Sequence, residues 1–87
     1  MISFGKYKEA IEYFEKALKI NLKAFGDKHP KVAENLSNMG KVYNSLGNYE
    51  KSKEYIKKAL GIYELTLGKN HPETEKVRNI LSIYSKK

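Results

Sequence analysis

The sequence GKYKEAIEYFEKALKINLKAFGDKHP at residues 5–30 recurs without a gap as GNYEKSKEYIKKALGIYELTLGKNHP at residues 47–72. Eleven of these 26 aligned positions are identical at an offset of 42 residues, whereas ordinary composition gives about one or two identities by chance. Each copy ends in the same segment, Gly-x-x-His-Pro. The chain therefore contains an internal repeat, which is typical of architectures built from stacked units.

Beyond Pro72 the second copy aligns better at an offset of 41 residues. At this offset three residues of the first copy meet a similar or identical residue: Leu36 and Val77, Asn38 and Asn79, Tyr43 and Tyr84. The change of offset predicts a one-residue deletion near residues 74–76. Because a terminal repeat need not present a stacking face to a successor, the shortened copy is expected to be the last of an array.

The hydrophobic pattern between the repeated segments is helical. From Tyr7 to Phe25 apolar residues recur at intervals of three and four, and charged residues occupy the opposite face, with Glu12–Lys16 as one expected ion pair and Glu54–Lys58 as its repeat. Gly26 and Gly68 follow these runs and are expected to end helices. The sequence predicts four helices and no strand: Lys6–Phe25, Lys31–Leu46, Asn48–Leu67 and Glu73–Ser85.

Each proline of the Gly-x-x-His-Pro segments is expected at the first position of a helix, where its fixed φ is already suitable. The two histidines, His29 and His71, are expected to cap these helix starts or pack in the loop. A metal site is disfavoured, because neither histidine has a cysteine or a second histidine nearby in the sequence.

Length and composition limit the possible functions. The chain has 87 residues, of which 40% are hydrophobic and 31% charged, so it forms at most one small domain. Its net charge of +7 favours acidic partners. The chain has no cysteine, which excludes disulfides and thiol chemistry and suits the cytoplasm, where we expect the protein. No stretch is long and apolar enough to suggest a membrane span or a secretion signal.

The repeat resembles the tetratricopeptide repeat, in particular the 42-residue kind found in kinesin light chains. The first-helix pattern of that family is matched by Leu36, Met39-Gly40 and Tyr43. The second-helix pattern is matched by Gly47, Tyr49, Ile56 and Ala59-Leu60, and by equivalent residues one repeat earlier. Leu81 departs from the pattern, since at the offset of 41 it stands where the family has a small residue.

The resemblance implies an all-α fold of antiparallel helix-turn-helix units, a fragment of an α-solenoid. In that reading residues 1–26 form the second helix of one repeat, residues 27–68 form one complete repeat, and residues 69–87 form the first helix of a terminal repeat. About three repeats are normally needed for a stable stack. We therefore expect apolar end faces, through which the chain could associate with a second copy.

The resemblance also implies a concave groove lined by the first helices of successive repeats. Polar residues at intervals of four, three and four form the expected stripe on each helix. The candidate peptide-binding residues are Glu34, Ser37, Asn38, Lys41 and Ser45 in one helix and Arg78, Asn79 and Ser82 in the next. An asparagine amide can donate to and accept from an extended peptide backbone, and Lys41 and Arg78 could select acidic side chains. The alternative is that Asn38 and Asn79 make only local polar contacts.

The sequence therefore predicts a protein-interaction module that binds an extended, acidic peptide, with no cofactor and no catalytic activity. No nucleophile motif, phosphate loop or clustered pair of acids is present to suggest an enzyme. One alternative is single-stranded nucleic acid, with Tyr13 and Tyr55 stacking on bases, but the lysines are mixed with glutamates and form no basic stripe. The other alternative is a purely structural or self-assembling solenoid segment.

Overall fold

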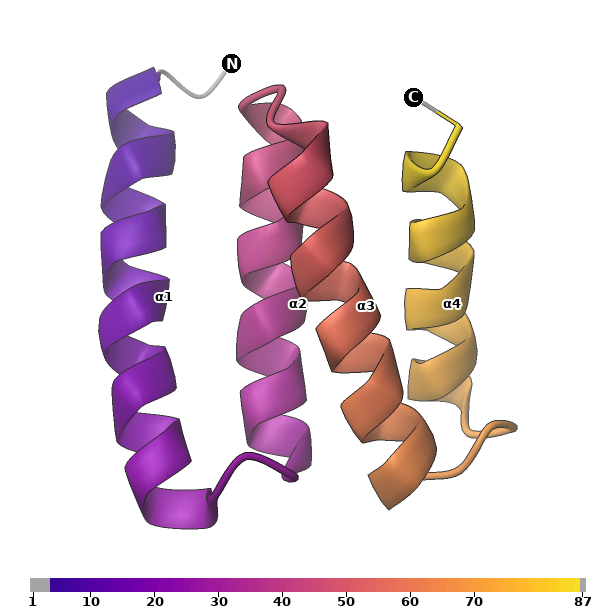
Figure 1. The fold of residues 1–87 in the computed structure, drawn as a ribbon. Helices are drawn as coiled ribbons and strands as arrows, with labels where there is room; N and C mark the ends of the chain where they lie inside the picture. Colours follow the sequence, from indigo (N-terminus) through magenta and orange to yellow (C-terminus); the bar gives the residue numbers. More distant parts are fainter. Residues whose placement is uncertain (1–3, 87) are drawn as a thin grey trace.

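The computed structural model describes residues 4–86, and these form four α-helices and no strand. The helices are α1 (Phe4–Phe25), α2 (Pro30–Ser45), α3 (Tyr49–Thr66) and α4 (Pro72–Tyr84). Successive helices run in opposite directions, and α3 crosses in front of α2 (Figure 1). The four predicted helices are confirmed, with ends no more than two residues from the expected positions. The division of the chain into repeat units stays a prediction.

Three glycines make the turns between the helices. Gly26, Gly47 and Gly68 have φ values of 83°, 86° and 90°, a left-handed conformation that glycine adopts without the strain a Cβ would cause. Pro30 and Pro72 lie in the first turns of α2 and α4, as predicted. The loop between α1 and α2 is therefore built in the same way as the loop between α3 and α4.

The two histidines cap the helices that follow them. The Nδ1 atom of His29 accepts a hydrogen bond from the backbone N–H of Lys31 at 3.1 Å. His71 makes the same contact with the N–H of Glu73, also at 3.1 Å. Each bond satisfies one of the backbone N–H groups that a helix start leaves without a partner.

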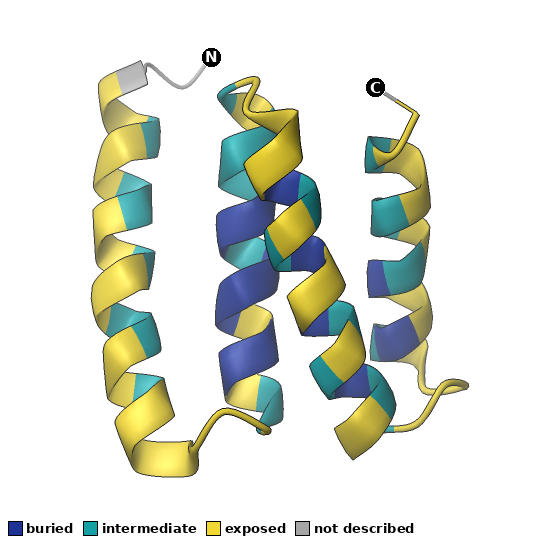
Figure 2. Cartoon of the chain, in the orientation of Figure 1, coloured by how far each residue is buried: buried dark blue, intermediate teal, exposed yellow. Residues whose placement is uncertain are grey.

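The closest helix packing joins α2 and α3. A Cβ added at Gly40 would lie 2.7 Å from two side-chain carbons of Ile56, so only glycine allows this approach. The hydroxyl of Ser52 donates to the carbonyl of Gly40 at 2.6 Å and is fully buried. The buried residues of these two helices face each other along the crossing (Figure 2). The core is therefore centred on the α2–α3 pair.

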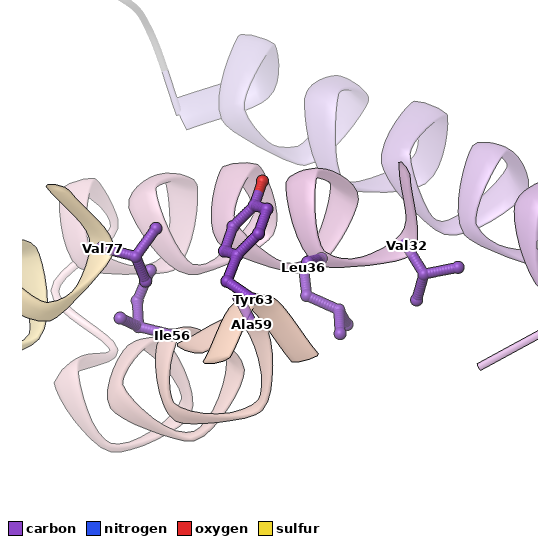
Figure 3. Close-up of a cluster of buried hydrophobic side chains, with 7 residues drawn as sticks. Val32, Leu36, Ile56, Ala59, Tyr63 and Val77 are labelled. Carbon is purple, nitrogen blue, oxygen red and sulfur yellow. The ribbon is translucent and has the colours of Figure 1, made fainter. Parts of the chain in front are cut away.

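Two different contacts attach the outer helices to this pair. The side-chain amide of Asn35 on α2 donates to the carbonyl of Phe14 on α1 at 3.0 Å and accepts from the amide of Asn21 at 2.6 Å. On the other side, Val77 of α4 lies beside Ile56 of α3 in the core cluster (Figure 3). The hydrogen bonds of Asn35 therefore help to join α1 to α2, and the apolar contact of Val77 helps to join α4 to α3.

These contacts show that the repeat keeps its offset of 42 residues through α4. Val77 and Ile56 stand 42 residues beyond Asn35 and Phe14, and α4 continues without a break from Pro72. One residue turns an α-helix by about 100°, so an offset of 41 would align side chains that lie on different faces. The deletion predicted near residues 74–76 is therefore wrong.

The corrected offset changes which residues are equivalent. Asn38 corresponds to Ile80 and not to Asn79. Gly40 corresponds to Ser82, so a small residue does occupy this position in α4. Leu81 corresponds to Met39 and is no departure from the repeat.

Some residues of α1 differ from the sequence prediction. Leu22 and Phe25, predicted on the buried face, are 39% and 48% exposed. Phe25 stacks on the ring of His29, with centroids 4.3 Å apart.

Among the ion pairs of the described residues, neither Glu12–Lys16 nor Glu54–Lys58 occurs. Within residues 4–86, no helix combines the length and apolar character needed to cross a membrane.

Candidate functional site

A line of polar side chains follows the solvent-facing side of α2. Glu34 and Ser45 are exposed, and Asn38 and Lys41 are half-buried. Because their spacing is four, three and four residues, these side chains lie within about 60° of one another around the helix axis. Among the contacts of the described residues, no hydrogen bond or ion pair engages the side chains of Asn38 and Lys41. We call these four residues the α2 stripe.

Ser37, also predicted to contact a peptide, does not belong to this stripe. It retains only 5% of its surface. Ser37 is separated from the centre of the stripe by about 70° on the helix, and it is buried. A peptide bound to the α2 stripe therefore cannot reach its hydroxyl without displacing the packing around it.

The three α4 residues predicted for the site lie on other faces of that helix. The buried line of α4 runs through Thr74 and Val77, and Asn79 lies on the opposite side, exposed to solvent with Ser82. Arg78 is engaged within the chain: its Nη2 atom lies 3.4 Å from a carboxylate oxygen of Glu64 and donates to the carbonyl of Lys69 at 3.1 Å. The structure does not bring these residues together with Asn38.

The residues that do correspond to the α2 stripe are 42 positions further along. They are Lys76, Ile80, Ile83 and Lys87, of which Ile83 is 58% exposed and Lys87 lies outside the described residues. The sequence prediction missed them because the offset of 41 directed attention to Asn79. The equivalent positions therefore differ in chemistry, because the α2 stripe is polar throughout and its counterpart has two isoleucines between two lysines.

A hollow of about 310 Å³ lies where the starts of α2 and α4 approach each other. It is lined by His29, Pro30, Lys31, Glu34, Tyr63, Leu67, His71 and Glu73. Tyr63 comes from α3 and is only 3% exposed. Burial first of all, and then the carboxylates of Glu73 and Glu34, raise the pKa of the Tyr63 phenol to about 12. The phenol therefore stays protonated well above neutral pH, in a hollow that two acids also line.

The two histidines that line this hollow also cap helices, since the Nδ1 atom of each accepts a hydrogen bond from a backbone N–H at a helix start. Within the described part of the chain, no group of three or more His, Cys, Asp or Glu residues lies close enough together to hold a metal ion. The two acids of the hollow come from different helices, and the phenol of Tyr63 lines the same hollow. This arrangement favours a positively charged or neutral group of a ligand over a negatively charged one.

The two tyrosines considered for base stacking are placed differently. Tyr55 is half-buried, and its ring stacks on Tyr43 with centroids 5.5 Å apart and an interplanar angle of 3°. The ammonium of Lys51 lies 5.1 Å from the centre of the Tyr43 ring. Tyr13 is 69% exposed and meets Phe14 edge-on. Tyr55 therefore already uses one face of its ring within the fold.

Antiparallel helices that stack side by side around small residues define this chain as a helical-repeat scaffold. Two overlapping segments, residues 3–64 and 34–84, match the family model described as Tetratricopeptide repeat, and the chain belongs to that family. Repeats of this family generally mediate protein–protein interaction and are not catalytic modules. A search of curated proteins finds no match to the chain.

Proposed function

We propose that the protein is a non-catalytic interaction module that binds an extended peptide segment along the α2 stripe. The observation that carries this proposal is the unengaged, half-buried pair Asn38 and Lys41 within a continuous polar line. The amide of Asn38 can donate to one backbone group of a peptide and accept from another, whatever the peptide's side chains. The side chains of Ile80 and Ile83 would offer apolar contact on the neighbouring helix.

The charge order along the α2 stripe supports a preference for an acidic residue at one end of the peptide. Glu34 and Lys41 are seven residues apart, which is about 10 Å along a helix. An extended peptide covers about 10 Å in three residues. An Asp or Glu opposite Lys41 would therefore stand about three residues from the position opposite Glu34.

The other end of the stripe favours a different side chain. Glu34 shares the hollow with Glu73 and with the protonated phenol of Tyr63. A second acidic residue here would be repelled, whereas a lysine, an arginine or a neutral side chain would be accepted. The expected ligand is therefore acidic at the Lys41 end and not uniformly acidic.

The 42-residue spacing supports assignment to the kinesin-light-chain type of the family. The lack of cysteines supports work in the cytoplasm. In this proposal the chain acts as a scaffold that recognises a segment of another protein. A purely structural role would leave the polar groups of Asn38 and Lys41 without a ligand.

The test is selection from a library of random seven-residue peptides, using the native chain and a variant with Glu34→Lys and Lys41→Glu. The variant keeps the net charge but reverses the charge order of the stripe. The native chain should enrich peptides with an acidic residue about three positions from a basic or neutral residue, and the variant should enrich the reverse order. The same enrichment by both proteins would contradict the proposal.

Two further measurements separate the alternatives. Asn38→Ala should weaken a selected peptide by on the order of 1 kcal/mol, because a backbone hydrogen bond is lost. Asn79→Ala is the matched control and should have a smaller effect, since Asn79 is exposed on α4 and lies outside the α2 stripe. Binding that falls steeply with salt and does not depend on peptide sequence would instead favour nucleic acid.

A further inference from the structure

A second, larger groove lies between α1 and α3, with α2 as its floor. Its volume is about 630 Å³. Leu18 and Leu22 of α1 form one wall, and Val32 and Leu36 of α2 form the floor. The other wall is the face of α3 that contains Tyr55, Gly61, Ile62 and Leu65. We call this surface the α1–α3 groove.

The α1–α3 groove is separate from the α2 stripe. Val32 and Leu36 lie roughly 150–170° around α2 from the centre of the stripe, because each residue turns the helix by about 100°. Figure 3 shows Val32 and Leu36 projecting from the same side of α2, toward α3. A ligand in this groove would therefore not compete with a peptide on the stripe.

Gly61, which lines the α1–α3 groove, is a glycine that the packing of the helices does not explain. Glycine is among the least favourable residues inside a helix. The glycines of the three turns are explained by positive φ, and Gly40 is explained by its contact with Ile56. Gly61 lies within α3, and a Cβ added there would meet nothing within 4 Å. Nothing in the fold of the described residues requires this glycine, but it lowers the wall of the groove.

The charges at the rim of the groove are unbalanced toward positive. The carboxylate of Asp27 lies 3.9 Å from the ammonium of Lys28, so these two charges offset each other. Lys57 and Lys58 also line the groove. The ammonium of Lys58 lies 5.7 Å from the centre of the Tyr55 ring and forms no ion pair within the described residues. An occupant with acidic flanks would complement these lysines.

The walls of the groove determine the backbone conformation of its occupant. The lining is contributed mainly by helices, whose backbone groups are bonded within each helix. An extended peptide would bury N–H and C=O groups that find no partner on such walls. A helix satisfies its own backbone and presents only side chains. The α3 wall from Tyr55 to Leu65 is about 15 Å long, which equals about three turns of a second helix.

We propose that the α1–α3 groove binds an amphipathic helix of a partner protein, with leucine-like residues on its buried face and acidic residues at its edges. This mode places residues i, i+3, i+4 and i+7 of a helix into an apolar groove. The glycine wall lets the partner backbone come close to α3. Lys57 and Lys58 select the acidic edges.

The experiment uses a stapled 14-residue helix with leucines at i, i+3, i+4 and i+7 and glutamates elsewhere, labelled for fluorescence anisotropy. A counterpart with lysines in place of the glutamates is the charge control. The glutamate helix should bind the full chain at least tenfold more tightly than the lysine helix at low salt. The double variant Lys57→Glu and Lys58→Glu should reverse this order.

Gly61→Leu tests whether the groove itself is the binding site. This variant should weaken the glutamate helix at least tenfold, and its thermal unfolding midpoint should be equal to or above that of the native chain. Ala24→Leu also introduces a leucine, at an exposed position of α1 outside the groove, and it should leave the affinity unchanged.

Three outcomes would overturn the inference. The first is equal affinity for the two helices, and the second is full binding by the folded Gly61→Leu variant. The third is that the native chain binds dodecanoate but not the glutamate helix, and that Gly61→Leu blocks the binding of dodecanoate. The groove would then be a site for an anionic lipid. None of these outcomes affects the α2 stripe, which is tested with different variants.

Discussion

The helices α2 and α4 begin in the same way but are packed differently. Each starts at a proline after a histidine cap with the same 3.1 Å bond. α2 lies between α1 and α3 and has seven buried residues, whereas α4 meets α3 on one side and has two. The same place in the repeat therefore gives an interior helix in one case and a surface helix in the other, according to the neighbours present.

Equivalent residues in the two helices show how far this difference goes. Ser37 is buried, and the residue 42 positions later, Asn79, is exposed. Asn35 holds α1 by hydrogen bonds, and its equivalent Val77 packs in the core. Repeat position alone therefore does not tell whether a polar residue is a binding group, a packing group or a solvated one.

The largest expected effect comes from replacing the small residue of each helix by valine. Gly40→Val should destabilise the chain by about 1–3 kcal/mol or more, because the new side chain overlaps Ile56. Ser82→Val, at the equivalent exposed position of α4, should change the free energy of unfolding by no more than about 0.5 kcal/mol. Urea unfolding of both variants measures the difference. Equal losses would mean that α4 is packed on both sides in solution.

A pH-dependent effect is expected from Tyr63, which lines a hollow together with an acid of α2 and an acid of α4. Its pKa is about 12 in the folded chain against an ordinary value of 10.0. As the pH rises above 10, the unfolded chain loses this proton first, so the free energy of unfolding falls until about pH 12. The loss attributable to Tyr63 is up to about 2–3 kcal/mol.

Tyr63→Phe should lack this part of the decrease, and comparison of the two proteins cancels the titration of lysines and other tyrosines. Glu73→Gln on α4 should lower the pKa of Tyr63 more than Glu34→Gln on α2, because Glu73 is the stronger of the two influences. Tyrosine resonances followed by NMR report the pKa in each variant. An ordinary pKa for Tyr63 in the native chain would contradict the burial described above.

The smallest effect concerns the one feature that α2 and α4 share. His29→Ala and His71→Ala should each lower the free energy of unfolding by about 0.5–1 kcal/mol. Each substitution removes one hydrogen bond to a backbone N–H at a helix start, and the two bonds have the same length. Thermal unfolding of the two single variants gives the comparison. A clearly greater loss for His29→Ala would show that its stacking on Phe25 contributes more than its cap.

The candidate site could be predicted only in part. Glu34, Asn38, Lys41 and Ser45 were identified from spacing alone, because residues at intervals of four, three and four share a helix face. Ser37 and Asn79 were assigned to the same site but lie elsewhere. The role of each residue depends on which helix packs beside it and on its position around its own helix axis. The three residue pairs aligned at an offset of 41 do not determine that position.

The grooves illustrate the same limit. Leu22 has the spacing of a buried residue, and the amphipathic pattern of α1 correctly indicates one apolar face. That face packs mainly against α2, and the part beside α3 is left open as a wall of the α1–α3 groove. Gly61 carried no signal in the sequence, because a helix-interior glycine gains meaning only when its surroundings are known.

The sequence by itself determined the features that depend on neighbouring residues along the chain. Gly26, Gly47 and Gly68 set the turns because positive φ is strained for other residues, and His-Pro segments set the helix starts. The tertiary structure alone decided which faces are buried, which polar groups are engaged, and where the grooves lie. Burial depends on contacts between helices distant in sequence, and a rotation of about 100° per residue converts a one-residue error of register into a different face.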